Sequence, residues 1–230
     1  MSWEKFGTTA YFFNTFNEPI DDKIVKRLGK IYSIEFVNFS DFYQIQYHGY
    51  HLMSGFNGFN KSVDKLPSHI KSIIFSYSFN QPVGQLPAKL KELVFGYDFN
   101  KSVDNLPAGL KKLIFGKKFN HPVENLPNKI KILSFGYDFS QSLDYLPCSV
   151  THLDIVYGTK LNLDNLPVSI KFLYVGYQNK NHINNKTMID NFSFGSGSND
   201  ILFVNIGPNT KIIPYDNFLA NKLRHKKIIL

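Results

Sequence analysis

The amino-acid sequence predicts a β-solenoid, in which short parallel strands stack one coil after another. A Leu-Pro pair recurs every 20 residues, at 66–67, 86–87, 106–107, 126–127, 146–147 and 166–167. Aliphatic residues follow each pair at fixed distances, as Leu110 and Leu113 follow Pro107. A self-similar period of about 20 to 50 residues is the signature of architectures in which each unit packs on its neighbours.

Each unit is expected to contribute one strand. The step of two from Leu113 to Phe115 places both side chains on one face of a strand. A single unit cannot bury that face, so successive units must stack, with parallel strands about 4.8 Å apart in a right-handed coil. The residues expected to be buried in the central units are Leu93, Phe95, Leu113, Phe115, Leu133 and Phe135.

The segments between the strands carry turn residues in register. Proline belongs in these connections because it lacks a backbone donor. Glycines that allow a bend where a side chain would clash follow the strand pairs at 96, 116, 136 and 176. We expect aligned bonds to the backbone across the turn from Asn60, Asn80, Asn100 and Asn120. Carboxylates expected to cap the turn before each Leu-Pro pair are Asp64, Asp104, Glu124, Asp144 and Asp164.

The repeated phrase Phe79-Asn80-Gln81-Pro82-Val83, echoed by Phe119-Asn120-His121-Pro122-Val123, resembles the FNIP repeat. That repeat is a relative of the leucine-rich repeat, familiar from slime moulds and from giant viruses of amoebae. The resemblance covers residues 59–178 in six units. It implies a leucine-rich-repeat-like coil that presents a surface and does not catalyse. Some members of the resembling families carry an N-terminal F-box, which recruits a ubiquitin ligase, but residues 1–58 contain no convincing one.

We expect degenerate capping units at both ends, because an open end would expose the core. Residues 1–58 form the N-terminal cap, with stray repeat phrases at 16–20 and 31–36 and a short helix at 21–30 ended by Gly29. The spacing between those phrases is about four residues longer than in the regular units. Residues 179–230 form the C-terminal cap, with closing strands and a basic helix at 216–227. A bulge is expected at 155–160, where the phrase is altered.

Composition narrows the classes of function. One cysteine, Cys148, excludes an internal disulfide and favours a reducing, intracellular and cytoplasmic location, in a host cell if the chain is viral. No signal peptide or apolar run of about 20 residues is present, so we expect no membrane contact. Catalytic motifs, histidines at metal-site spacing and a phosphate-binding glycine loop are absent from the sequence. We therefore expect a monomer without cofactor or metal that is not an enzyme.

A column of tyrosines is the first candidate contact surface. It comprises Tyr77, Tyr97, Tyr137, Tyr157 and Tyr177, with Lys117 in the remaining place. Tyrosine is enriched at interfaces because its ring is amphipathic. The alternative is that these rings only stack on one another and shield the glycine turns. An outward column of the strands also changes from aliphatic to polar along the chain, from Ile74 to Asp154, which suggests a graded binding face.

A ladder of lysines is the second candidate surface. It comprises Lys71, Lys91, Lys111, Lys131 and Lys171, in a chain of net charge +8. It is either a solvated edge that aids solubility or a strip that binds anions. Lysine outnumbers arginine 24 to 2, which A/T-rich codons could explain. The scarcity of arginine argues against base-specific contacts with nucleic acid.

The function predicted from the sequence is a non-catalytic scaffold that presents an extended repeat surface to an unidentified protein, for example as a substrate-recognition module. The alternative is binding of nucleic acid or another anionic ligand through the lysine ladder and the tyrosine column together, since aromatic rings beside positive charge suit single strands. Nucleic acid is the less favoured partner.

Overall fold

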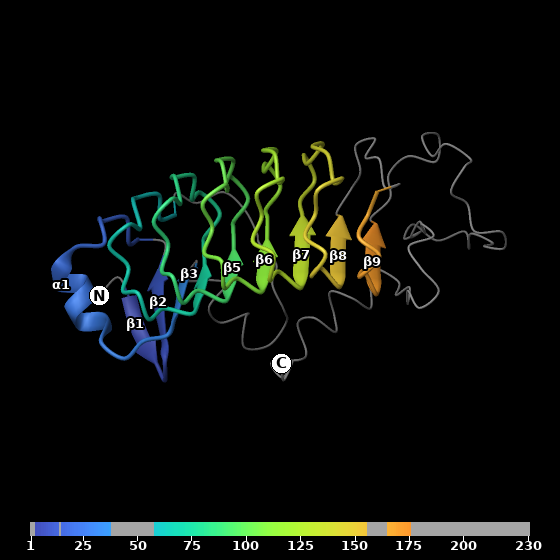
Figure 1. The fold of residues 1–230 in the computed structure, drawn as a ribbon. Helices are drawn as coiled ribbons and strands as arrows, with labels where there is room; N and C mark the ends of the chain where they lie inside the picture. The colour runs from blue at the N-terminus through green and yellow to red at the C-terminus, as the bar shows by residue number, and fades with distance from the viewer. Residues whose placement is uncertain (1–2, 14, 38–57, 156–164, 176–230) are drawn as a thin grey trace, which may run out of the picture.

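A computed structural model describes residues 3–13, 15–37, 58–155 and 165–175. These form a nine-stranded sheet whose strands follow one another in chain order (Figure 1). The strands are β1 (Trp3–Phe6), β2 (Thr9–Phe13), β3 (Ser33–Val37), β4 (Ser72–Ile74), β5 (Glu92–Val94), β6 (Lys112–Ile114), β7 (Ile132–Phe135), β8 (His152–Ile155) and β9 (Phe172–Val175). The single helix of the described residues, α1, spans Asp22–Leu28.

All strands from β2 to β9 pair in parallel, which confirms the predicted solenoid. The register advances by one whole unit per coil, so that Leu93 pairs with Leu113 and Leu113 pairs with Leu133. Both of the expected inward positions are buried: Leu113 is fully enclosed and Phe115 is 3% exposed. The other predicted core residues of the central units are buried as well.

Three tight turns close each coil and return the chain to the next strand. The N–H of Phe79 donates to the carbonyl of Ser76, at 3.4 Å, just after a strand. The N–H of Leu66 donates to Val63, at 3.1 Å, and that of Leu110 donates to Pro107, at 3.0 Å. The last bond recurs at all six Leu-Pro pairs. Each proline therefore opens a turn, where its missing N–H removes no sheet bond.

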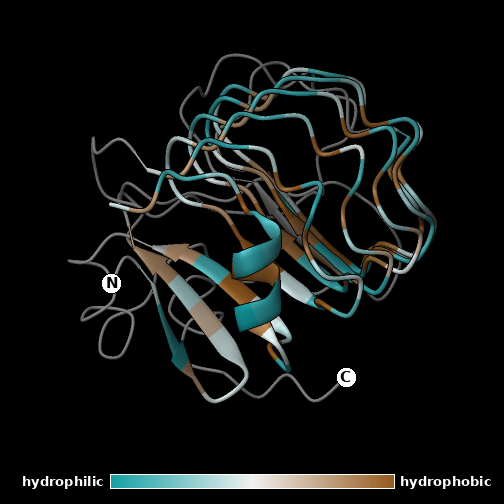
Figure 2. Cartoon of the chain, turned by 90° about the vertical axis from the view of Figure 1, so that its left-hand side faces the viewer, coloured by the Kyte–Doolittle hydropathy of each residue, from teal (hydrophilic) through white to brown (hydrophobic). Residues whose placement is uncertain are grey.

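Two columns of stacked phenylalanine fill the centre of the coil. One contains Phe12, Phe36, Phe75, Phe95, Phe115 and Phe135, and the other contains Phe16, Phe59, Phe79, Phe99, Phe119 and Phe139. Within a coil the rings of Phe95 and Phe99 lie 3.6 Å apart, only 8° from parallel. Viewed along the stack, successive coils overlie one another, and apolar segments alternate with polar ones along each coil (Figure 2). Burial of these rings supplies much of the stability of each unit.

The coils spread apart with distance from the sheet. Equivalent rings lie 4.5 Å apart at Tyr77 and Tyr97, beside the strands. The spacing is 5.6 Å between Phe95 and Phe115 in the first core column, and 6.2 Å between Phe79 and Phe99 in the second. Since equivalent side chains repeat once per coil, these distances measure the step between coils. The stack therefore bends with the sheet on its inner, concave side.

The glycines that follow β5, β6 and β7 are required by the neighbouring coil. A Cβ placed on Gly116 would lie 1.9 Å from the carbonyl oxygen of Gly96, and one on Gly136 would lie 2.0 Å from that of Gly116. Neither glycine has a positive φ. The expected clash is confirmed, and its cause is contact between coils instead of the backbone conformation of the turn.

Two kinds of turn alternate at the corner before the Leu-Pro pairs. In one kind, the hydroxyl of Ser102 accepts from the N–H of Asp104 and donates to its carboxylate, at 3.3 and 2.6 Å. The same pair recurs two units away in each direction, at 62–64 and 142–144. The units between them carry proline in place of the serine, at Pro82 and Pro122. The expected capping by aspartate therefore acts through a serine in every second unit.

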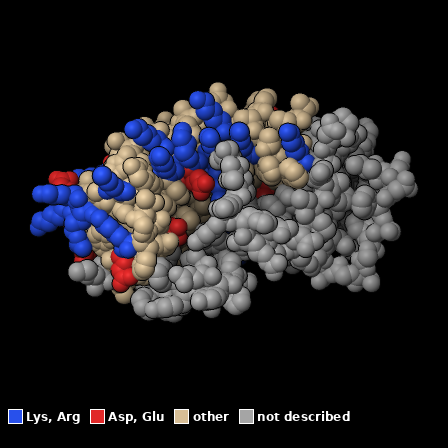
Figure 3. Space-filling view, turned by 90° about the horizontal axis from the view of Figure 1, so that it is seen from below, with Lys and Arg blue, Asp and Glu red and all other residues tan. Residues whose placement is uncertain are grey.

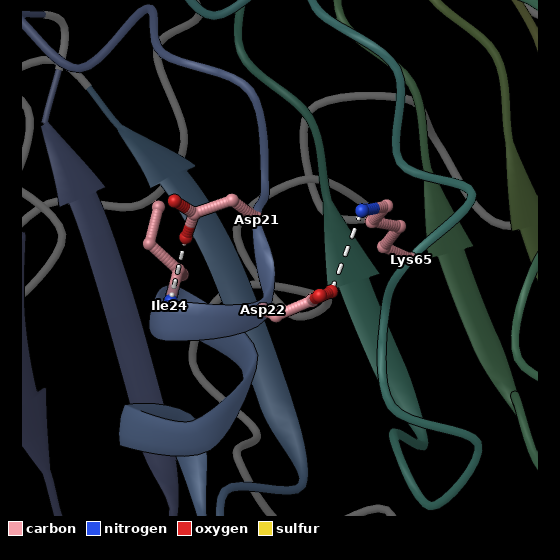
Figure 4. A network of polar contacts seen from close by, with 4 residues as sticks. All are labelled: Asp21, Asp22, Ile24 and Lys65. Atoms are coloured by element: carbon pink, nitrogen blue, oxygen red, sulfur yellow. Dashed lines mark hydrogen bonds and ion pairs between the residues drawn. The ribbon is translucent and has the colours of Figure 1, made fainter.

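The N-terminal coil accommodates its four extra residues as α1. The carboxylate of Asp21 accepts from the N–H of Ile24 at 2.9 Å and begins the helix, and Gly29, with φ of 55°, ends it. Beside it, Lys65 forms an ion pair with Asp22 at 3.4 Å (Figure 4). The expected helix and its terminal glycine are confirmed.

The hairpin of β1 and β2 covers the first coil and was not predicted. It turns at Gly7, whose φ is 59°, as favoured in a two-residue hairpin loop. Trp3 stacks on Phe12 with ring centroids 5.2 Å apart. The adjacent Glu4 and Lys5 are exposed on β1, and such charges on an edge strand oppose pairing with another sheet. The expected bulge at 155–160 lies, apart from Ile155, outside the described residues, and so do the expected closing strands and the helix at 216–227.

Candidate interaction surface

The tyrosine column lies at the carboxyl ends of the strands, directly after the glycines. Backbone bonds between coils hold it in register. The carbonyl of Tyr77 accepts from the N–H of Asp98 at 2.9 Å, and that of Tyr97 accepts from Lys118 at 3.0 Å. The carbonyl of Lys117 accepts from Asp138 at 2.9 Å. Each side chain of the column is therefore carried by a fixed part of the coil.

The side chains of this column stack on one another. The rings of Tyr77 and Tyr97 are 4.5 Å apart and 11° from parallel. The Nζ of Lys117 lies 5.2 Å from the ring centroids of both Tyr97 and Tyr137, between the two tyrosines. We call Tyr77, Tyr97, Lys117 and Tyr137 the aromatic strip. Tyr137 is 43% exposed and the other three are half-buried. Tyr157 and Tyr177 lie outside the described residues.

The charges of the aromatic strip are matched locally. Lys118 forms an ion pair with Asp98 at 2.7 Å, and this carboxylate raises the pKa of Lys118. Hydrogen bonding to Tyr97 raises the pKa of Lys117. Both amines are therefore protonated at neutral pH, and each already has a neighbour of opposite polarity. This arrangement favours a rigid, amphipathic contact surface over an anion-binding surface.

The lysine ladder lies at the other end of the strands, one residue before β4, β5, β6, β7 and β9, whereas Thr151 takes this place before β8. The N–H of Lys91 donates to the carbonyl of Lys71, and the N–H of Lys111 to that of Lys91, at 2.7 and 2.8 Å. Lys71, Lys91, Lys131 and Lys171 are exposed, whereas Lys111 is half-buried. The Nζ of Lys71 lies 4.9 Å from the ring of Tyr32, and the Nζ of Lys91 donates to the carbonyl of Gly109 at 3.2 Å.

The structure does not bring the two strips together. Lys91 and Tyr97 are six residues apart with β5 between them, so up to roughly 20 Å of extended chain separates them. A single strand of nucleic acid could therefore not contact the lysine ladder and the tyrosine column in one row. The two surfaces must therefore be considered separately.

The outward face of the sheet changes character along the stack, as the sequence suggested. Ile74, Val94 and Ile114 are half-buried there, whereas Ser134 and Asp154 are buried, each 5% exposed. The hydroxyl of Ser134 donates to the Asp154 carboxylate at 3.0 Å. The polar residues of this column are thus paired with each other. Their burial was not predicted, because the strand period makes these positions look exposed.

Two further findings concern chemistry. Within the described residues, no three histidine, cysteine, aspartate or glutamate side chains gather closely enough to hold a metal ion. The helix found there is too short to cross a membrane.

A stack of 20-residue coils with one short parallel strand each defines a leucine-rich-repeat-like solenoid. The family model described as FNIP Repeat matches residues 59–98, 82–118 and 119–158. Residues 59–158 of this chain are therefore similar to FNIP repeats. No curated protein matches it. Among solved structures, a protein described as CroV588, a novel circular LRR protein, is 30% identical over 76% of this chain and 32% of its own, with a TM-score of 0.41. The chain thus spans about a third of that protein's length.

Proposed function

We propose that this chain is a non-catalytic scaffold that binds a protein partner through the aromatic strip. The observation that carries the proposal is the stacked arrangement of Tyr77, Tyr97, Lys117 and Tyr137, held in register by backbone bonds and partly open to solvent. The proposed partner is an intracellular protein bound by a monomer, since a chain with one cysteine suits a reducing compartment.

The physical basis is the low cost of ordering such a surface. Association immobilises side chains, at about 0.5–1.5 kcal/mol for each flexible one. The stacked rings of the aromatic strip are already fixed against each other, so less freedom is lost when a partner binds. Tyrosine also combines a large apolar area with a hydroxyl group that can form hydrogen bonds. The competing explanation is that the rings only shield the backbone around Gly96 and Gly116.

The test is affinity capture from cell lysate with quantitative mass spectrometry, using the wild type and two variants. Tyr97→Ala with Tyr137→Ala should reduce capture of the partner at least tenfold while the thermal midpoint stays within a few degrees. Charge reversal at Lys91 and Lys131 should change capture less than threefold, since exposed charges contribute little at physiological salt. Unfolding of the tyrosine variant would support the shielding role, and a partner lost only on lysine reversal would contradict the proposal.

A further inference from the structure

The lysine ladder is part of a larger basic surface that includes the turns before the strands. The N–H of Ile31 donates to Leu28 at 3.1 Å, as the N–H of Ile70 donates to Pro67, so the turn that enters β3 is equivalent to those at the Leu-Pro pairs. Lys30, Lys89 and Lys129 occupy the same place in these turns. We call the following set the basic edge: Lys30, Lys71, Lys89, Lys91, Lys111, Lys129, Lys131 and Lys171.

The basic edge carries no compensating charge of its own. Seven segments carry these lysines: residues 28–32, and the six that run from a Leu-Pro pair to the residue before the next strand. None of these segments contains aspartate or glutamate. All of its lysines except Lys111 are exposed. Seen from the side of the strands' amino ends, lysine and arginine side chains form a row along the molecule, continuous with those near the N-terminus (Figure 3).

The spacing of these charges fits a phosphodiester backbone. From β3 to β9 the basic edge spans six coil steps of about 4.8 Å, or roughly 29 Å in all. Eight lysines over that length give about one positive charge per 4 Å. One strand of a DNA duplex presents a phosphate about every 3.4 Å of helix axis. A row one or two side chains wide can therefore follow one backbone of a duplex.

The composition of the basic edge disfavours other partners. In the segments that carry the basic edge, aliphatic residues such as Leu90 and Leu110 are buried and cannot insert into a membrane. Only Tyr32 and Val168, near the two ends, are exposed large apolar side chains in these segments. A protein partner would lack central anchors, and a single strand would lack the stacking platforms it needs. Lysine without arginine suits phosphate contacts and not base recognition.

We propose that the basic edge binds duplex nucleic acid along one phosphodiester backbone, without sequence preference. The proposal is independent of the aromatic strip, which lies at the opposite ends of the strands. It predicts binding that weakens steeply with salt, with a slope of log K against log salt of magnitude about 4 or more, because four or more phosphates are neutralised.

The test is fluorescence anisotropy with labelled DNA duplexes of about 20 base pairs and unrelated sequences, from about 50 to 200 mM salt. Lys91→Glu with Lys131→Glu should weaken binding at least tenfold at low salt and reduce the slope by about 2. The matched control is Lys61→Glu with Lys101→Glu, also two coils apart but on another corner. Each pair lowers the net charge from +8 to +4. The control should change binding less than threefold.

Several outcomes would overturn the proposal. The first two are absence of binding at 50 mM salt and equal weakening of binding by the two pairs of lysine substitutions. The others are a preference of tenfold or more for one duplex sequence, and tighter binding of anionic lipid vesicles or polyglutamate than of the duplex. Circular dichroism establishes that each variant is folded. If the Lys91 and Lys131 variant is not, Lys89→Glu with Lys129→Glu replaces it, since both of these exposed lysines lie in turns.

Discussion

At the scale of single residues, the closest approach between coils decides which side chains are allowed. The carbonyl oxygen of one coil occupies the space that a methyl group on the next would need, at Gly96, Gly116 and Gly136. The sequence shows a glycine column, and a column of glycines has two possible causes, an unusual backbone conformation or a close contact. Only the structure distinguishes these causes, and it shows a close contact between the glycine and the backbone of the preceding coil.

Gly116→Ala should therefore destabilise the protein by about 3 kcal/mol or more, the cost of overpacking against a backbone that cannot move aside. Gly84→Ala is the matched control, because a Cβ there meets nothing within 4 Å and the residue does not have a positive φ. Chemical denaturation of both variants measures the difference. A loss below 1 kcal/mol in Gly116→Ala would show that neighbouring coils separate easily.

The candidate surface was predicted in outline and not in its contacts. The tyrosine column and the lysine ladder follow from the period, because residues one unit apart lie in the same column. The place of Lys117 between two rings appears in the sequence only as an interruption of the tyrosines. The distance between the two strips depends on which end of the strand each occupies, so the alternative of one anion-binding site on both strips together is not supported.

At the scale of elements, hydrogen bonds from one coil to the next replace the contacts that a longer strand would make. The side-chain oxygen of Asn80 accepts from the N–H of Asn100 at 2.9 Å, and that of Asn100 accepts from Asn120 at 3.0 Å. This row of asparagine hydrogen bonds, the asparagine ladder, begins at Asn17 and continues to Ser140. The expected alignment of asparagines is confirmed, and the bond to the next coil's backbone N–H explains why asparagine recurs in four successive units.

Asn100→Ala removes one acceptor of this ladder and should cost about 1–2 kcal/mol, since the N–H of Asn120 loses its partner. Asn100→Asp keeps an oxygen in the same place and should recover most of the loss. Urea denaturation at neutral pH compares the two variants. Equal destabilisation by alanine and aspartate would mean that the side-chain oxygen is not what the position requires.

The serine–aspartate turns should make stability depend on acid. Hydrogen bonds from Ser102 and Asn125 lower the pKa of Asp104, and those from Ser142 and Asn165 lower the pKa of Asp144. A native pKa below the unfolded value of about 3.9 stabilises the fold above that pH. This contribution is lost as pH falls through the lowered native pKa.

Replacing both carboxylates, by Asp104→Asn with Asp144→Asn, should therefore make the thermal midpoint fall less steeply below pH 4 than in the wild type. Ser102→Ala with Ser142→Ala should have the same effect while leaving the carboxylates in place. Thermal melts between pH 2.5 and pH 7 measure the slope. An unchanged acid slope in both variants would contradict the assignment of these turns.

At the scale of the whole molecule, each coil contacts mainly the coil before it and the coil after it. Stability is then approximately a sum of unit and interface terms. The order of strands and the core were predictable for this reason, since one unit repeated six times specifies its own packing. The first strand of the N-terminal hairpin has no repeat to reveal it, since it is short and Trp3 matches no repeat phrase. The second strand does carry a repeat position, because Phe12 stands four residues before Phe16, as Phe95 stands before Phe99.

Deleting one whole unit, residues 101–120, should leave a shorter folded solenoid, because Asn100 then precedes His121 and every column keeps its register. Deleting residues 101–110 should abolish folding, since half a unit places apolar residues on the outside. Circular dichroism and analytical ultracentrifugation measure both. Similar damage from the two deletions would show that the coils are not modular.

The alternation of serine–aspartate and proline turns bears on how such a chain lengthens during evolution. Asn125, in a coil with a proline turn, donates to Asp104 of the preceding serine–aspartate coil, so these two coils of different kind bond to each other. Duplicating a single unit would set two coils of one kind side by side, whereas duplicating a pair preserves every such bond. The matched ranges 59–98 and 119–158 are each one pair long. If chains lengthen by duplicating such pairs, relatives of different length should differ by even numbers of units.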